Sequence, residues 1–231
     1  MRLDKFLVHA GIATRKEAAK LIRGGHVTVS GVCVKRPESM LCPETDPVAV
    51  NGESVCYRAY TYLMLNKPAG LISATDDPRQ RTVLELLPQP LQRIGLFPCG
   101  RLDKDTVGLL ILTNDGALAH RLLSPKHHAE KSYRFETDAP ISDPDALRCG
   151  VDLGDFITLP CTLTLDTPQS GLITLTEGKY HQIKRMTETQ GAQITFLERV
   201  SFAGIPLDAS LARGAWRYLS DEEIAKLQAQ T

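Results

Sequence analysis

Residues 100–116 read GRLDKDTVGLLILTNDG, a polar loop that runs into a short apolar segment and ends in turn-forming residues. The apolar run from Leu109 to Leu112 predicts a buried β-strand, and the Thr113-Asn-Asp-Gly sequence favours a turn after it. Asp103 and Asp105 therefore lie at the entrance of this strand.

Length and composition restrict the class of protein. With 231 residues, 42% of them hydrophobic, the chain can form one large domain or two smaller ones. No apolar run approaches the roughly 20 residues of a membrane span, and the first ten residues lack the apolar block of a signal peptide. We therefore expect a cytoplasmic protein that does not associate with a membrane.

The sequence offers little for a metal. The adjacent side chains of His127 and His128 diverge on an extended segment, and no third ligand has suitable spacing. The cysteines are far apart and form no Cys-x-x-Cys pair, so we expect reduced thiols, no zinc and no other cofactor. They are Cys33, Cys42, Cys56, Cys99, Cys149 and Cys161.

The first 36 residues are basic although the whole chain has a formal net charge of zero. They hold eight lysines and arginines against only Asp4 and Glu17. Such a local excess of positive charge can bind nucleic-acid phosphates, but it is also compatible with a solvated helix face.

The same region has the pattern of a small helical module followed by a hairpin. Apolar residues at helical spacing in residues 3–10 predict a first helix, and Thr14 with Glu17 forms a capping box for a second. The Gly24-Gly25 pair would end that helix, and the alternating valines of residues 27–34 predict a hairpin. The second helix leaves four basic side chains available for solvent or phosphate: Arg15, Lys16, Lys20 and Arg23.

This order of elements, with Arg2-Leu-Asp-Lys-Phe-Leu and Arg23-Gly-Gly-His-Val-Thr-Val-Ser-Gly, resembles the RNA-binding domain named after ribosomal protein S-four. The resemblance covers about the first 55 residues. It implies that Arg15, Lys16, Lys20 and Arg23 contact RNA phosphates. A helical module that merely packs on the next domain remains the alternative.

Four later motifs occur together: Leu65-Asn-Lys-Pro-Ala-Gly, Gly100-Arg-Leu-Asp, Lys131-Ser-Tyr and Glu177-Gly-Lys-Tyr-His-Gln-Ile-Lys-Arg-Met. Each is weak alone, but in this order they resemble the RsuA type of pseudouridine synthase. The resemblance implies an α+β protein: a small S-four-type (alpha-L) domain and a synthase domain with a mixed, mostly antiparallel sheet flanked by helices. We expect domains at residues 1–57 and 62–231, joined by a linker at 58–61.

The resemblance also assigns roles to residues. Asp103 matches the catalytic aspartate, acting as a nucleophile on the sugar or as a base at the neighbouring carbon, and Lys184 matches the cation paired with it. Tyr133 would stack on the base, with removal of the proton from carbon five as a second role. Arg101 would fill the place of the flipped-out nucleotide in the RNA stack, or else form a surface ion pair with Asp105.

The expected function is isomerisation of one uridine in ribosomal RNA to pseudouridine. The stretch at residues 120–128 resembles the branch that acts on small-subunit RNA, so we expect this RNA or its assembly intermediate as partner, and a monomeric enzyme. Alternatives are a synthase acting on large-subunit RNA and a non-catalytic RNA-binding or assembly factor. The presence of Asp103, Tyr133 and Lys184 disfavours loss of catalysis.

Overall fold

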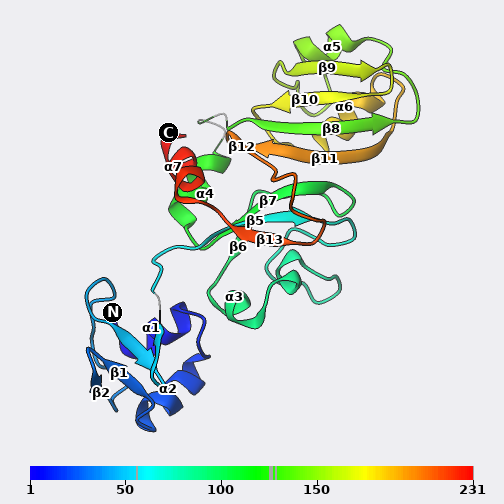
Figure 1. Ribbon diagram of the computed structural model, residues 1–231. Coiled ribbons are helices and arrows are strands. Elements are labelled where there is room, and N and C mark those ends of the chain that lie inside the picture. Colours follow the sequence, from blue (N-terminus) through cyan, green and yellow to red (C-terminus); the bar gives the residue numbers. More distant parts are fainter. Residues whose placement is uncertain (56, 125–126, 128, 231) are drawn as a thin grey trace. The chain divides into compact units, whose positions relative to one another are not determined.

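The computed structural model describes residues 1–55, 57–124, 127 and 129–230 (Figure 1). The chain divides into two compact units, one made of residues 1–61 with 84–97 and the other of residues 62–83 with 98–231. The domains expected from the sequence were each one continuous segment. Their boundaries at residues 57 and 62 remain a proposal. No helix in the described part of the chain is long and apolar enough to cross a membrane.

The first unit begins with two short helices, α1 (Leu3–His9) and α2 (Arg15–Arg23). Thr14 and Glu17 cap α2 reciprocally, as their spacing predicts, and α2 ends at Gly24. Between the helices Gly11 has a φ of +74°, a left-handed conformation that glycine adopts without strain.

A four-stranded antiparallel sheet completes this unit in the order β2-β1-β3-β4. The predicted hairpin is confirmed as β1 and β2, which are joined by the left-handed residues Ser30 and Gly31. The strands are β1 (Val27–Val29), β2 (Val32–Cys33), β3 (Val48–Val50) and β4 (Glu53–Val55). The segment 84–97 adds the end of the 3-10 helix η1 (Val83–Leu86) and helix α3 (Gln89–Arg93).

The second unit is built on a nine-stranded sheet with the main order β13-β5-β7-β11-β8-β10-β9. Strands β7 and β11 are parallel, and the other neighbours along this order are antiparallel. The expected mixed, mostly antiparallel sheet is therefore confirmed. Its strands are β5 (Tyr62–Lys67), β6 (Phe97–Cys99), β7 (Val107–Thr113), β8 (Lys131–Thr137), β9 (Thr162–Thr167), β10 (Ser170–Leu175), β11 (Ile194–Phe202), β12 (Ile205–Pro206) and β13 (Trp216–Tyr218).

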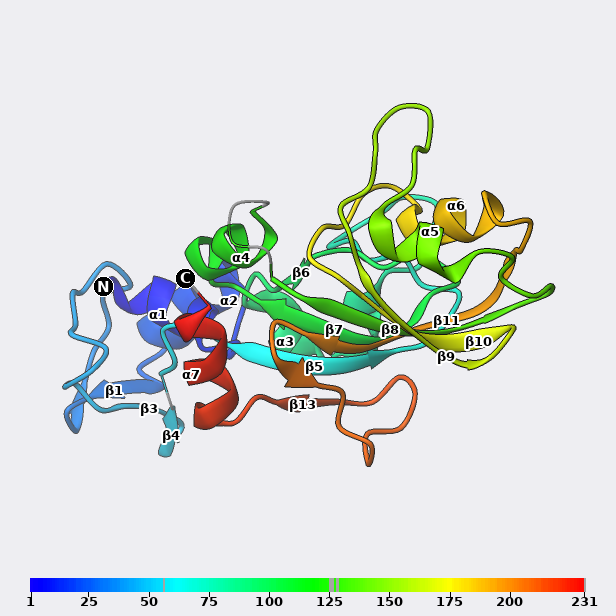
Figure 2. The ribbon, with the colours of Figure 1, turned by 90° about the horizontal axis from the view of Figure 1, so that it is seen from above.

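Burial follows the sequence pattern of each strand. Every residue of β5 and β7 is buried, as expected of central strands covered on both faces, whereas β8 alternates between buried and exposed positions from Tyr133 onward. Helices flank the sheet, and Figure 2 shows α5 and α6 on the same side of it. The helices are α4 (Gly116–Leu123), α5 (Pro144–Cys149), α6 (Gln182–Glu188) and α7 (Asp221–Ala229).

Candidate active site

The parallel pairing of β7 with β11 brings two distant segments together. Residues 100–106, which we call the Asp103 loop, lead into β7, while helix α6 precedes β11. Val107 and Gly108 pair with Glu198 and Arg199 of β11. Because neighbouring parallel strands are entered from the same edge of a sheet, the Asp103 loop and α6 meet there.

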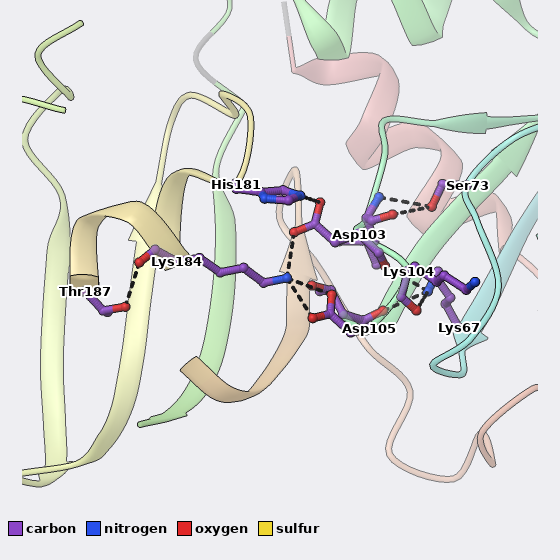
Figure 3. A network of polar contacts seen from close by, with 10 residues as sticks. Lys67, Ser73, Asp103, Lys104, Asp105, His181, Lys184 and Thr187 are labelled. Carbon is purple, nitrogen blue, oxygen red and sulfur yellow. Dashed lines mark hydrogen bonds and ion pairs between the residues drawn. The ribbon is translucent and has the colours of Figure 1, made fainter. Parts of the chain in front are cut away.

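A fully buried lysine holds the backbone of the Asp103 loop. The side chain of Lys67, at the end of β5, donates hydrogen bonds to four carbonyl oxygens at 2.8–3.2 Å (Figure 3). Three of them belong to Asp103, Lys104 and Thr106, and the fourth to Pro68. Burial lowers the pKa of Lys67 to about 8, an effect opposed by the charges of Asp105 and Asp103.

A second contact fixes the residue immediately before Asp103. The hydroxyl of Ser73 accepts a hydrogen bond from the Leu102 amide at 3.0 Å and donates one to the Leu102 carbonyl at 2.9 Å. Leu102 itself is buried. The loop is therefore anchored through its backbone, which leaves the Asp103 carboxylate to face the residues of α6.

The cation opposite Asp103 is Lys184, on the first turn of α6. Its Nζ lies 3.2 Å from Asp103 Oδ2 and 2.7 and 2.8 Å from the two oxygens of Asp105 (Figure 3). The side chains of Lys184 and Asp103 are 19% and 31% exposed, whereas Asp105 is 72% exposed. One lysine therefore contacts both a partly buried carboxylate and an exposed one.

The electrostatics of this cluster favour its charged forms. Burial acts against the charge of Lys184, but hydrogen bonds to Asp105 and Asp103 outweigh it and raise the pKa of Lys184 above its ordinary value. Burial likewise acts against the charge of Asp105, and the Lys184 ammonium outweighs it and lowers the Asp105 pKa. Both shifts favour the ion pair between Lys184 and Asp105, which keeps a protonated ammonium beside Asp103.

The turn before α6 is also fixed by side chains. Gln182 is buried, donates to Glu177 Oε1 at 2.6 Å and accepts from the Lys179 amide at 3.0 Å. These two hydrogen bonds give a structural role to the glutamate and the glutamine of the motif at residues 177–186. It places His181 so that its Nε2 lies 3.6 Å from Asp103 Oδ1.

These groups surround a cavity of about 80 Å³. Its wall combines the Asp103 carboxylate with the Lys184 ammonium, and the buried Tyr133 from β8 contributes an aromatic ring. The remaining lining residues are mainly apolar or belong to the turn: Arg101, Leu102, Thr106, Leu175, Glu177, Gly178, Lys179, His181, Gln182, Ile183 and Leu197. A small planar group could be held here beside the Asp103 carboxylate and the ring of Tyr133.

The structure brings together the four residues selected for this site from the sequence. Asp103, Tyr133 and Lys184 line one cavity, and the exposed Arg101 lies at its rim. The alternative ion pair between Arg101 and Asp105 is not present, because Asp105 binds Lys184 instead.

Sequence reasoning gave no role to three residues of this region: Lys67, Asp105 and His181. Lys67 appears there only within the motif at residues 65–70, and Asp105 only as an acid at the strand entrance and an alternative partner for Arg101. The signal for Lys67 was its place at the end of an apolar strand. His181 lies within the motif that supplies Lys184, and Asp105 lies two residues after the motif that supplies Asp103.

The basic residues selected in the first unit lie on α2, and all four side chains are exposed. At about 100° per residue, Lys16, Lys20 and Arg23 fall within roughly 60° of one another around the helix. Arg15 lies farther round and comes within 3.9 Å of the buried carboxylate of Asp4. Lys16, Lys20 and Arg23 therefore form the more continuous basic stripe.

In the described part of the chain, no group of three or more histidine, cysteine or acidic side chains could hold a metal ion. His128, one half of the pair considered from the sequence, lies outside the described residues, as does Cys56.

Comparison with known proteins agrees with the fold and the motifs. The family model described as RNA pseudouridylate synthase matches residues 61–189, and the S4 domain model matches residues 1–46. An uncharacterized RNA pseudouridine synthase of Bacillus subtilis, YtzG, is 45% identical, with 97% of each chain covered. The ribosomal small subunit pseudouridine synthase A of Escherichia coli is 42% identical, covering 98% of this chain and all of that protein.

A solved structure described as a pseudouridylate synthase has 36% sequence identity and a TM-score of 0.70, covering 98% of this chain and 99% of that one. Family models, relatives and fold therefore agree along nearly the whole sequence. This chain belongs to the RNA pseudouridylate synthase family, an isomerase family, and carries an S4 domain ahead of its catalytic domain.

Proposed function

We propose that this protein converts one uridine of small-subunit ribosomal RNA to pseudouridine, with Asp103 as the reacting carboxylate. The observation that carries the proposal is the ion pair of Asp103 with Lys184 in the wall of a cavity that also contains Tyr133. The small-subunit RNA is proposed because a relative with 42% identity is named for it. We also propose that the protein acts as a monomer in the cytoplasm.

The chemistry requires that the bond between the sugar and uracil nitrogen be broken, the base turned, and a new bond made from carbon five to the same sugar carbon. Asp103 can form a bond to the sugar carbon as the base leaves, and this bond breaks when carbon five attaches to the same carbon. Alternatively, Asp103 can remove a proton from the adjacent carbon as the base leaves and return it after the new bond has formed. In both routes the ionised form reacts, and the Lys184 ammonium lies 3.2 Å from one of its oxygens. The detached base must remain in the cavity, because water would otherwise hydrolyse the intermediate.

Tyr133 and the apolar wall fit the task of holding the base while it turns. The ring of Tyr133 is buried at the cavity, where it can stack on uracil. The proton on carbon five must leave when the new bond forms. Tyr133 is one candidate acceptor, but a neutral phenol is a weak base, so stacking is its primary proposed role.

The test uses ribosomal RNA whose uridines carry tritium on carbon five, since this atom is lost when pseudouridine forms. We expect the wild-type protein to release tritium from small-subunit RNA and to release much less from large-subunit RNA. Asp103→Asn should bind the RNA equally well and release none. Turnover near the wild-type rate in Asp103→Asn would remove Asp103 from the reaction, and release confined to large-subunit RNA would refute the proposed substrate.

A further inference from the structure

Tyr180 exposes a large aromatic surface beside the catalytic cavity. It is 76% exposed, although both of its neighbours in sequence, Lys179 and His181, line the cavity. Its ring lies nearly parallel to that of His181, with 3.9 Å between centroids and 15° between planes. One face of the tyrosine is therefore supported by protein.

The stacked pair is connected to the reacting carboxylate. His181 Nε2 lies 3.6 Å from Asp103 Oδ1, on the side of the carboxylate opposite the Lys184 contact (Figure 3). Asp103 is therefore in contact with the imidazole of His181, which in turn stacks on the exposed ring of Tyr180. Anything stacked on Tyr180 would lie next to the cavity rather than inside it.

The backbone keeps these rings in place against a local preference. His181 has a φ of +48° and a ψ of +33°, the left-handed conformation that is strained for a residue with a β-carbon. The hydrogen bonds of Gln182 to Glu177 and Lys179 hold the turn in this form. Such strain, maintained by neighbouring contacts, is concentrated at functional sites.

The surroundings favour a nucleic acid over a protein or a membrane as the occupant. Arg101 and Lys179 are exposed at the rim of the cavity and supply positive charge for a phosphate backbone. An enzyme that acts on a base must remove it from its stack, which leaves the adjacent base without one of its partners. Aromatic side chains bind such unpaired bases by stacking, largely without regard to sequence.

We propose that Tyr180, supported by His181, is the platform on which an unpaired base next to the target uridine stacks when the RNA binds. This inference rests on the proposed function, because it assumes that a uridine enters the cavity beside Asp103. It assigns Tyr180 to positioning of the RNA and not to bond chemistry.

The experiment places 2-aminopurine, a base whose fluorescence falls on stacking, at each position flanking the modified uridine in a small-subunit RNA fragment. For Tyr180→Ala we expect KM to rise by about tenfold, within the range typical of losing one stacked base, with kcat changed less than about twofold. The fluorescence decrease on binding should be lost at one flanking position. Tyr180→Phe should restore both properties, because stacking needs the ring and not the hydroxyl.

Tyr218→Ala is the matched control, since Tyr218 is an exposed tyrosine of the same unit, 43% exposed, that does not line the cavity. It should behave as wild type. An unchanged KM and fluorescence change in Tyr180→Ala would overturn the platform, and so would failure of Tyr180→Phe to recover. In parallel, Asp103→Asn should keep the fluorescence change without turnover; normal turnover in that variant would refute the proposed chemistry while the fluorescence still decides on Tyr180.

Discussion

Lys184 lies closer to Asp105 than to Asp103, with its Nζ 2.7 Å from Asp105 Oδ1 and 3.2 Å from Asp103 Oδ2. The exposed carboxylate therefore takes the shorter, two-oxygen contact, and Asp103 interacts through one oxygen. The other oxygen of Asp103, Oδ1, is not engaged by Lys184 and lies 3.6 Å from His181 Nε2. This arrangement suits a carboxylate that is positioned by the cation and still has one oxygen available to react.

Replacing Lys184 with methionine should lower kcat by about 100-fold, because Asp103 then loses its only ion-pair contact with a lysine or arginine in the described residues. The expected loss is below that of a fully buried pair, since Asp103 keeps some access to water. Single-turnover rates at saturating RNA measure it. Lys184→Arg preserves the charge and should retain most activity; equal losses in both variants would show that shape, and not charge, is the requirement.

The contribution of Asp105 to stability should depend on pH in one direction. Its folded-state pKa is lowered, so the stabilisation is present above the ordinary value near 4 and is lost as pH falls through the folded value. Lys184 has a raised pKa and keeps its charge up to at least pH 10. Wild type should therefore exceed Asp105→Asn in unfolding free energy by a constant amount between about pH 5 and 9.

Urea unfolding at pH 3, 5, 7 and 9 checks this expectation. Asp105 is largely exposed, so the constant difference should be no more than about 1 kcal/mol, and it should shrink at pH 3. A difference that grows in acid would mean that the Asp105 carboxylate is destabilised in the folded protein.

Lys67→Met should damage both stability and catalysis. It removes the ammonium from four carbonyl oxygens, of which those of Asp103 and Lys104 keep a backbone N–H donor and those of Pro68 and Thr106 lose the Lys67 hydrogen bond, so we expect the unfolding free energy to fall by about 3 kcal/mol and kcat by more than tenfold. Lys104→Met is the matched control, because the Lys104 side chain is exposed and bonds Gln80. Denaturant unfolding together with turnover distinguishes the two, and similar losses in both variants would contradict a specific role for Lys67.

The basic residues of α2 should govern the salt dependence of RNA binding. If each neutralises one phosphate, replacing Arg15, Lys16, Lys20 and Arg23 with alanine should flatten the slope of log affinity against log salt by about 3 to 4 units. Most of the change should come from the stripe of Lys16, Lys20 and Arg23, since Arg15 is near Asp4. Chemistry at saturating RNA should persist, and an unaltered slope would make this face ordinary solvated surface.

Local elements were predictable because their signals lie in neighbouring residues. The capping box of Thr14 with Glu17 forms, and the apolar run at Leu109–Leu112 lies within a buried strand. The helix in the motif at 177–186 begins only at Gln182. The left-handed turn before it depends on side-chain contacts that a periodic pattern does not contain.

The contacts of the site were not predictable from spacing. Seventy-nine residues separate Lys184 from Asp105, and only the parallel pairing of β7 with β11 brings their segments together. Family resemblance supplied the pairing of Lys184 with Asp103, but it gave no place to Asp105. Lys67 was missed because lysine is rarely fully buried, and its burial depends on four carbonyls gathered by the folded loop.

The two hydrogen bonds between Ser73 and Leu102 bear on which uridines the enzyme can reach. With Ser73 and Lys67 holding the backbone of the Asp103 loop, this loop has little left to rearrange when RNA binds. A target uridine must then come to Asp103. We therefore expect an RNA fragment whose uridine is accessible to be modified faster than one in which folded RNA already encloses that uridine.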